Sequence, residues 1–277
     1  MDTTLPLPFL PSVDLTKGAT ESRDGLTRIQ LSYLGCVHFT ATDDSLDTLL
    51  QFLQRHVSIE SYVDVTAISS ADDIIMALDA GAKKVFVKDA QLAALSQYGD
   101  RVIPVLAGEV SKYANGVLVY SDSVDTSRSN LEKLASQKTS PVFLTTSATD
   151  PEPFVKLAQE FSAIPIIPAT SLTIESKVEG KVSVPEVVGS AWTSDRADKL
   201  IPTVVTDERG IALGLVYSSQ ESFAESLKTG TGVYQSRKRG LWYKGATSGD
   251  IQELVRVSLD CDQDCLKFVV RQKGRGK

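Results

Sequence analysis

The sequence predicts an α/β N-terminal domain followed by a small β-rich α+β domain. The first two-thirds of the chain alternates short β-branched runs with segments of helical period. A stretch rich in glycine, serine and charged residues follows, and the last eighty or so residues show hairpin patterns. Alternating strands and helices favour a parallel sheet or a partial (β/α) barrel. We therefore expect an α/β domain of unknown role at 1–170, a linker at 171–197 and a β-rich domain at 198–277.

The first domain is predicted as a series of strands and helices. Residues 28–34, "RIQLSYL", are strand-like, and residues 44–56 space their leucines at helical intervals. In the helix expected at 70–82, Ser70 can cap the start and Gly81 can end it. Further strands are expected at 61–67, 84–88, 101–106, 116–121, 141–146 and 164–169. Further helices are expected at 89–99, 129–137 and 151–162.

The second domain follows a segment with neither helical period nor strict alternation, which is typical of a connection. Residues 200–219 predict two strands around the turn "DERG", and the helix after them should end at Gly230. The remaining elements are a helix at 220–230, a hairpin at 232–238 and 241–245, and a strand at 251–259.

Composition and charge exclude several classes of protein. The net charge of -6 argues against a nucleic-acid partner for the whole molecule. From Asp198 onward there are 13 Lys and Arg against 10 Asp and Glu, a balance of +3 that leaves -9 for residues 1–197, so the C-terminal part suits an anionic ligand. No apolar run approaches the ~20 residues of a membrane span, and the N-terminus lacks a secretory pattern. Cys36, Cys261 and Cys265 form no disulfide framework, so we expect a reducing, cytoplasmic location.

The first domain carries no recognisable catalytic or phosphate-binding motif. Neither G-x-G-x-x-G after a first strand nor G-x-x-x-x-G-K-[ST] is present. His38 and His56 are the two histidines, and neither lies beside a cysteine, carboxylate or serine in a recognisable catalytic arrangement. We expect each of them to be a surface or half-buried residue.

Three aspartates alternate with other residues in "DCDQDC". In an extended segment Asp260, Asp262 and Asp264 would share one face, about 6.6 Å apart per step. Such carboxylates repel one another unless a cation lies among them, and hard oxygen ligands suit Mg²⁺ or Ca²⁺, although an EF-hand is excluded by its missing glycine. A solvated acidic turn is the alternative. Cys261, between two of the acids, favours a metal site, but a zinc ion needs three protein ligands and the local sequence supplies fewer.

A polar loop and a basic cluster precede this motif. The segment "KGATSG", from Lys244 to Gly249, can wrap a phosphate with backbone N–H groups and hydroxyls. Arg237, Lys238 and Arg239 can clamp a second phosphate. The alternatives are an ordinary polar turn and a solvated basic face.

Taken together, "GVYQSRKRGLWYKGATSGDIQELVRVSLDCDQDC" resembles the phosphoribosyl-AMP cyclohydrolase family of histidine biosynthesis. The match runs from about Leu200 to Val270 and keeps the order "YxSR", "LWxKGxTSGxxQ" and "DCDxD". The preceding α/β region is more loosely similar to the N-terminal part of eukaryotic multifunctional histidine-biosynthesis proteins. In those proteins a pyrophosphohydrolase and a histidinol dehydrogenase follow the cyclohydrolase, and neither follows in this sequence.

The resemblance implies a homodimeric hydrolase that acts on phosphoribosyl-AMP, an adenine nucleotide whose N1 carries a second phosphoribosyl group. The implied reaction hydrolyses the N1–C6 bond of the adenine ring with metal-activated water. By resemblance Cys261 is a zinc ligand, in sites that draw on both chains, and the three aspartates hold Mg²⁺. The resemblance identifies no catalytic side chain. The substrate-binding residues it implies are Arg237, Arg239, Trp242, Lys244, Thr247, Ser248, Gly249 and Gln252.

Three features depart from the family pattern. Ala246 stands where the family has a glutamate, and Cys265 replaces an alanine as a small apolar residue. The family continues with a "CHxxxxxxC"-type segment that gives the zinc two more cysteines, whereas these residues end at "RQKGRGK". We therefore expect a truncated chain with an incomplete zinc site. The rival hypotheses are a fragment that binds nucleotide or Mg²⁺ without turnover, and an N-terminal domain that serves as an assembly module.

Overall fold

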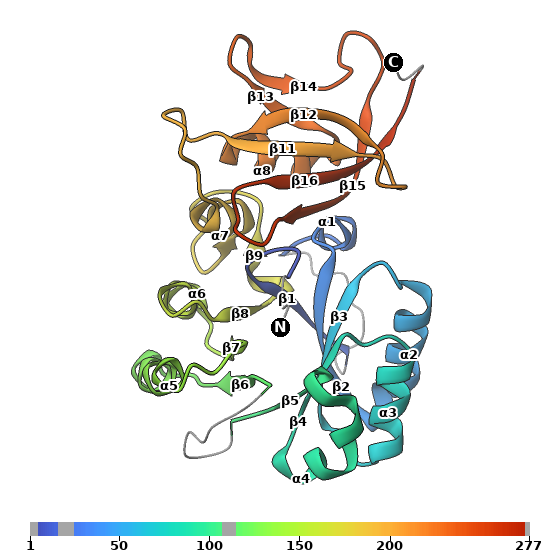
Figure 1. The fold of residues 1–277 in the computed structure, drawn as a ribbon, viewed down its shortest axis with the longest axis vertical. Coiled ribbons are helices and arrows are strands. Elements are labelled where there is room, and N and C mark those ends of the chain that lie inside the picture. Colours follow the sequence, from blue (N-terminus) through green and yellow to red (C-terminus); the bar gives the residue numbers. More distant parts are fainter. Residues whose placement is uncertain (1–4, 16–24, 107–114, 275–277) are drawn as a thin grey trace. The chain divides into compact units, whose positions relative to one another are not determined.

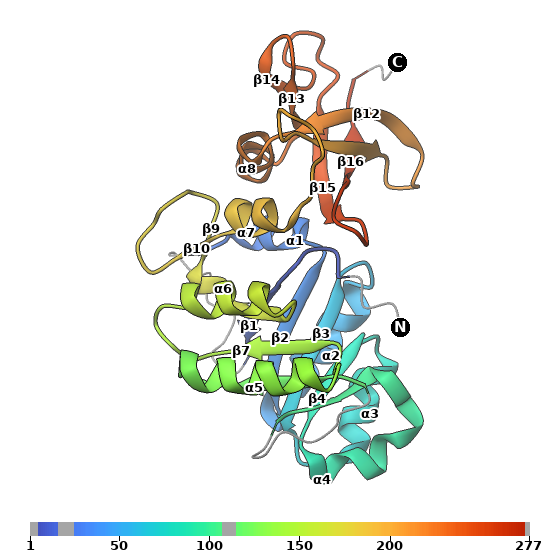
Figure 2. The same cartoon turned by 60° about the vertical axis from the view of Figure 1, so that its left-hand side comes forward.

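A computed structural model describes the chain and shows two compact units. The described residues are 5–15, 25–106 and 115–274. One unit, the barrel unit, comprises residues 9–22 and 36–171. The other, the C-terminal unit, comprises residues 1–8, 23–35 and 172–277. Both units are drawn in Figures 1 and 2.

The barrel unit is built on eight parallel strands in the order β5-β4-β3-β2-β1-β8-β7-β6. The two end strands of this order also meet, through a parallel bridge between Val105 and Leu118 and a hydrogen bond of 2.8 Å from the Leu106 N–H to the Leu118 carbonyl. The sheet is therefore a near-closed (β/α) barrel, which confirms the predicted fold class. The strands are β1 (Leu10–Asp14), β2 (Cys36–Thr42), β3 (Glu60–Ala67), β4 (Lys84–Val87), β5 (Val102–Pro104), β6 (Val117–Tyr120), β7 (Val142–Thr145) and β8 (Ile164–Pro168).

Helices cover the outside of the barrel strands. Figure 1 shows α2 and α3 beside β2 and β3, and α5 and α6 beside β6 and β7. Leu131 of α5 and Leu157 of α6 pack on Val117 and Val119, because alternate residues of a strand face outward. The helical segments are η2 (Asp43–Ser45), α2 (Leu46–Arg55), α3 (Ala71–Asp79), α4 (Asp89–Leu92), η3 (Ala93–Arg101), α5 (Val124–Ser136), α6 (Glu152–Glu160) and η4 (Ala169–Ser171).

The other alternate residues fill the barrel. The rings of Phe86 on β4 and Phe143 on β7 are 5.0 Å apart, and Tyr62 and His38 pack on them at 6.0 and 5.6 Å. The interior is therefore a packed core, as in other (β/α) barrels. Because His38 is only 4% exposed, the expectation of a surface or half-buried residue was wrong for it. Burial lowers the pKa of His38 to about 4, and Ser12 Oγ lies 2.8 Å from its Nδ1.

Two sequence expectations near the N-terminus differ from the structure. Residues 28–34 were predicted as a strand but contain helix α1 (Arg28–Tyr33). The reason is a capping box: the Gln30 N–H donates to Thr27 Oγ1 at 3.2 Å, and the Thr27 N–H donates to Gln30 Oε1 at 2.9 Å. The sequence analysis also missed β1 and β2. The prolines of "FLPSVD" obscured β1, although Pro11 fits the strand.

The C-terminal unit is built on a four-stranded sheet in the order β12-β11-β16-β15. The predicted "DERG" hairpin is confirmed, and α8 ends at Gly230, whose positive φ of 66° suits a glycine C-cap. Strand β16 was not predicted, yet it lies between β11 and β15 and buries Phe268 completely. The elements are β9 (Leu172–Thr173), β10 (Val182–Ser183), α7 (Val184–Ala191), β11 (Ile201–Thr206), β12 (Ala212–Ser218), α8 (Gln220–Thr229), β13 (Val233–Ser236), β14 (Gly240–Tyr243), β15 (Gln252–Leu259) and β16 (Leu266–Gln272).

N-terminal residues also belong to the C-terminal unit. The Leu259 N–H at the end of β15 donates to the Pro6 carbonyl at 2.7 Å, and α1 packs beside β15. The segment expected as a linker contributes α7 and two short strands to this unit. None of the helices within the described residues has the length and apolarity needed to cross a membrane.

Candidate active site

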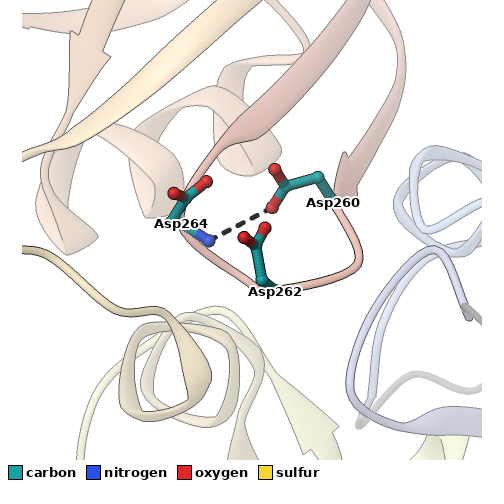
Figure 3. Close-up of side chains that lie close together, drawn as sticks. All are labelled: Asp260, Asp262 and Asp264. Carbon is teal, nitrogen blue, oxygen red and sulfur yellow. Dashed lines mark hydrogen bonds between the residues drawn. The ribbon is translucent and has the colours of Figure 1, made fainter.

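The three aspartates of "DCDQDC" lie on the tight turn that joins β15 to β16 (Figure 3). Asp260 Oδ1 accepts hydrogen bonds of 3.1 Å from the backbone N–H groups of Asp264 and Cys265. One carboxylate oxygen of each aspartate lies within 4.8 Å of the other two. The sequence analysis assumed an extended segment, but the turn brings the carboxylates closer together than an extended strand would.

The turn carries a negative electrostatic potential. The pKa of Asp264 is raised, chiefly by the negative charge of Asp262, then by burial and by Asp260 and Asp195. Asp195, which precedes β11, was not singled out from the sequence, because nothing in the sequence places it beside the turn. A divalent cation would relieve this repulsion, and carboxylate oxygens are the ligands that Mg²⁺ uses. The three carboxylates therefore fit a hard divalent cation.

The two cysteines of the turn differ in exposure. Cys261 is exposed, whereas Cys265 is half-buried and its thiol donates to the Leu266 carbonyl at 3.5 Å. The pKa of Cys265 is raised, first by burial. Among the described residues, the one cluster of three or more possible ligands consists of the three aspartates, without a cysteine. Cys261 can therefore give a zinc ion one exposed thiolate from this turn.

Backbone hydrogen bonds fix the conformation of the loop "KGATSG". The Lys244 N–H donates to the Gly232 carbonyl at 3.0 Å, and the Gly249 N–H donates to the Gly245 carbonyl at 2.8 Å. Gly245 has a φ of 84°, and a Cβ there would collide with the backbone of Asp250 and Ile251. Thr247 and Ser248 are exposed at the tip. Because the N–H groups of Lys244, Ala246 and Gly249 are engaged within the protein, we expect the hydroxyls and the lysine to be the main side-chain donors of this loop.

Three more of the predicted substrate contacts, Arg237, Arg239 and Trp242, lie on the β13–β14 hairpin. Arg237 stacks on Tyr217 at 5.7 Å, while the Arg239 N–H donates to Ser236 Oγ at 3.2 Å in the hairpin turn. Trp242 lies on β14, and Lys244 Nζ is 5.7 Å from the centroid of its ring. Trp242 and Lys244 therefore form one half-exposed surface for an aromatic or anionic ligand.

Gln252, the last predicted contact, is buried at 4% exposure. Its Oε1 accepts from the Tyr234 hydroxyl at 2.7 Å, and its Nε2 donates to Gln272 Oε1 at 3.0 Å. Both ends of the amide are thus engaged within the protein. Sequence reasoning missed Tyr234 as its partner, although both residues stand in the quoted motifs.

The loop and the aspartate turn lie at opposite ends of β15 (Figure 1). Gln252 begins the strand just after the loop, and Leu259 ends it just before the turn. A strand of 8 residues is about 26 Å long. Arg237 stacks on Tyr217, which is paired with Pro202 of β11. The next residue of β11, Thr203, is paired with the first residue of β16, just after the aspartate turn, so Arg237 lies at the end of the sheet near that turn. One chain therefore does not bring its loop and its aspartate turn together.

Comparisons with known proteins decide the family. Residues 214–276, which include the turn and the loop, match the family model of phosphoribosyl-AMP cyclohydrolase. The histidine biosynthesis trifunctional protein of Neurospora crassa is 52% identical over 99% of this chain, which covers 33% of that protein. The histidine biosynthesis bifunctional protein of Schizosaccharomyces pombe is 35% identical over 97% of this chain, which covers 68% of that protein. The chain belongs to the phosphoribosyl-AMP cyclohydrolase family of histidine-biosynthesis proteins.

The family resemblance expected from the motifs is thereby confirmed. The phosphoribosyl-AMP cyclohydrolase of Roseobacter denitrificans is 46% identical over 27% of this chain, which covers 60% of that protein. The cyclohydrolase family is metal-dependent, and the aspartate turn is the described cluster that fits an ion. The chain spans about a third of the length of the Neurospora relative.

Proposed function

We propose that the chain carries the phosphoribosyl-AMP cyclohydrolase step of histidine biosynthesis. In this reaction water adds to C6 of the adenine ring of phosphoribosyl-AMP and the N1–C6 bond breaks. The observation that carries the proposal is the coincidence of the matched residues 214–276 with the aspartate turn and the polar loop. The names of the fungal and bacterial relatives support the same pathway and reaction.

The proposed metal ligands are the side chains of the turn. Asp260, Asp262 and Asp264 would hold Mg²⁺, and Cys261 would contribute a thiolate to Zn²⁺. A bound zinc ion supplies the acidity that activates water for attack on an aromatic carbon near neutral pH. The acidic turn fits a cation because carboxylate oxygens of the three aspartates lie within 4.8 Å of one another and a cation would offset their repulsion.

The proposed substrate contacts are basic, hydroxyl and aromatic. Lys244 and Trp242 would meet the nucleotide together, since the ammonium already lies over the indole ring. The exposed hydroxyls of Thr247 and Ser248 would bind a phosphate, and Gly249, whose N–H donates to the Gly245 carbonyl, would hold the loop in the shape that presents them. The basic turn with Arg237 and Arg239 would bind the second phosphate. Gln252 lies behind this surface.

We propose a homodimer as the working form. The support is the separation of the loop and the turn by the length of β15, which leaves each half of the site without the other in one chain. A second copy can bring its loop to the first copy's turn, and symmetric dimers pair such surfaces reciprocally.

The barrel unit is proposed as an assembly module in the multifunctional protein. No catalytic motif was found in its sequence, and the segments 1–8 and 23–35 tie it by the chain to the C-terminal unit. Residues 198–277 remain our proposal for the cyclohydrolase-like domain, with 171–197 as the connection along the chain, although β9, β10 and α7 of that connection belong to the C-terminal unit. The odd number of cysteines, three in 277 residues, supports a reducing, cytoplasmic location.

Replacing Cys261 with serine is expected to abolish zinc binding by the purified chain, because a hydroxyl replaces the exposed thiolate. Zinc content is measured by elemental analysis after dialysis against zinc-free buffer. Cys265→Ser is the matched control. That half-buried thiol is bonded to the Leu266 carbonyl, so its loss should leave the zinc content unchanged.

Unchanged zinc in Cys261→Ser would refute the assignment of Cys261. A wild-type chain without zinc that still binds Mg²⁺ and nucleotide would favour the rival function, a binding fragment without turnover. This rival function is supported by the turn itself, which exposes one cysteine, Cys261, whereas a zinc site needs three protein ligands.

A further inference from the structure

A chain of hydrogen bonds, buried at Tyr234 and Gln252, links the β13–β14 hairpin to β15 and β16. Tyr234 is 1% exposed, and its hydroxyl donates to Gln252 Oε1 at 2.7 Å. Gln252 Nε2 donates to Gln272 Oε1, and Gln272 Nε2 donates to the Lys273 carbonyl at 2.8 Å. Strands β13, β15 and β16 are thus joined through three side chains. A network of this kind, buried at one end, fixes the orientation of its members.

Gly232 leaves the space that this network needs. A Cβ at Gly232 would lie 2.5 Å from the Tyr234 hydroxyl and 3.1 Å from Gln252 Oε1. The Gly232 N–H donates to the Gln252 carbonyl at 2.7 Å, and its carbonyl accepts from the Lys244 N–H at 3.0 Å. The absence of a side chain at Gly232 therefore lets the hydroxyl, the amide and the start of the polar loop meet.

The same tyrosine touches the proposed nucleotide surface. Its ring lies 6.1 Å from the Trp242 ring and 5.7 Å from the Phe268 ring. Lys244 Nζ in turn lies 5.7 Å from the centre of the Trp242 ring. Burial raises the pKa of Tyr234, so the hydroxyl keeps its proton and remains a donor. Contacts therefore lead without a gap from the buried Gln252 to the half-exposed Trp242 and Lys244.

We infer that Tyr234 is a positioning residue for the nucleotide site, acting with Gly232 and Gln252 to hold Trp242 and Lys244 in their binding geometry. This inference rests on the proposed function and adds residues to it: Gln252 acts through Tyr234 rather than by touching the substrate. The hydrogen bond of the Tyr234 hydroxyl orients the tyrosine ring, and that ring packs on the indole of Trp242. The Gly232 carbonyl holds the start of the polar loop through the Lys244 N–H.

Tyr234→Phe tests the inference because it removes the hydroxyl and keeps the ring. Loss of one buried hydrogen bond should speed amide exchange of residues 240–244 about fivefold and weaken the binding of adenosine monophosphate by a similar factor. Tyr243→Phe is the matched control, since Tyr243 donates to Glu225 at 3.0 Å on the exposed side of the same hairpin. It should change neither quantity.

A second pair of variants tests the geometry directly. Gly232→Ala should weaken nucleotide binding and speed hairpin exchange, because the new methyl group displaces the Tyr234 hydroxyl. In the Tyr234→Phe background part of this effect should vanish, because the oxygen at 2.5 Å is gone while the ring Cζ and Gln252 Oε1 remain 3.0 and 3.1 Å from the new methyl group. Fully additive effects of the two substitutions would overturn the inference. The non-additivity has to appear in nucleotide binding by the folded chain, because two residues in contact are coupled in their effect on stability as well.

The two proposals fail in different ways. If the wild-type chain binds neither adenosine monophosphate nor phosphoribosyl-AMP, the proposed function fails, and amide exchange still decides whether Tyr234 holds the hairpin. Equal exchange at residues 240–244 in Tyr234→Phe, Tyr243→Phe and wild type would overturn the inference even if the nucleotide binds. Faster exchange in Tyr234→Phe alone, with weaker nucleotide binding, would support both.

Discussion

Replacing Asp262 with asparagine is expected to weaken Mg²⁺ binding on the order of tenfold or more. Asp262 contributes the largest part of the negative potential at Asp264, and its oxygen lies within 4.8 Å of the oxygens of the other two aspartates. The substitution keeps the shape of the side chain and removes one of three charges. Isothermal titration of the metal-free chain with Mg²⁺ measures the change.

Asp195→Asn is the matched control for this prediction. Asp195 contributes to the potential at Asp264 but is not one of the three clustered ligands. Its replacement should weaken Mg²⁺ binding only slightly, and more so at low ionic strength. Equal titrations for Asp262→Asn and the wild type would show that the turn is a solvated acidic turn rather than a metal site.

The barrel is expected to lose about 2 to 3 kcal/mol of unfolding free energy through His38 as the pH falls from 6.5 to about 4. His38 is buried, and burial lowers its pKa from 6.5 to about 4 in the folded protein, against a smaller opposing effect of Asp64. Within this window the unfolded chain binds a proton that the folded barrel does not. The stabilisation is therefore present above the unfolded value and is lost as the pH falls below it.

Urea unfolding of the barrel at a series of pH values measures this effect. His38→Asn, whose side-chain oxygen can replace Nδ1 as the partner of Ser12, should show a shallower pH dependence between 4 and 6.5. Parallel curves for His38→Asn and the wild type would contradict the prediction.

The fold class was predictable from local patterns, but the closure of the barrel was not. The alternation of strands and helices predicted parallel pairing, and most strands appear where β-branched runs stand. Closure depends on β1, which pairs with both β2 and β8, and both β1 and β2 were missed. The strand predicted at residues 28–34 was wrong because a capping box stabilises a helix there despite an apolar, strand-like composition.

The candidate site was predictable in its residues and not in its arrangement. The spacing of the three aspartates signalled a shared cation, and the turn brings them together more closely than a strand would. Three-dimensional facts decided the rest. Asp195 joins the turn from a distant segment, and Gln252 turns inward to Tyr234 because Gly232 leaves it room. No local pattern in the sequence encodes these contacts.

Ring opening of phosphoribosyl-AMP, followed by absorbance, tests directly whether the chain has the proposed cyclohydrolase function. It is measured with Mg²⁺ and Zn²⁺ for the 277-residue chain and for the same chain extended by a family-type "CH…C" segment. We expect turnover by the extended chain and its loss when Asp262 is replaced with asparagine. A folded, extended chain that holds both metals and leaves phosphoribosyl-AMP unopened would show that the proposed function is wrong.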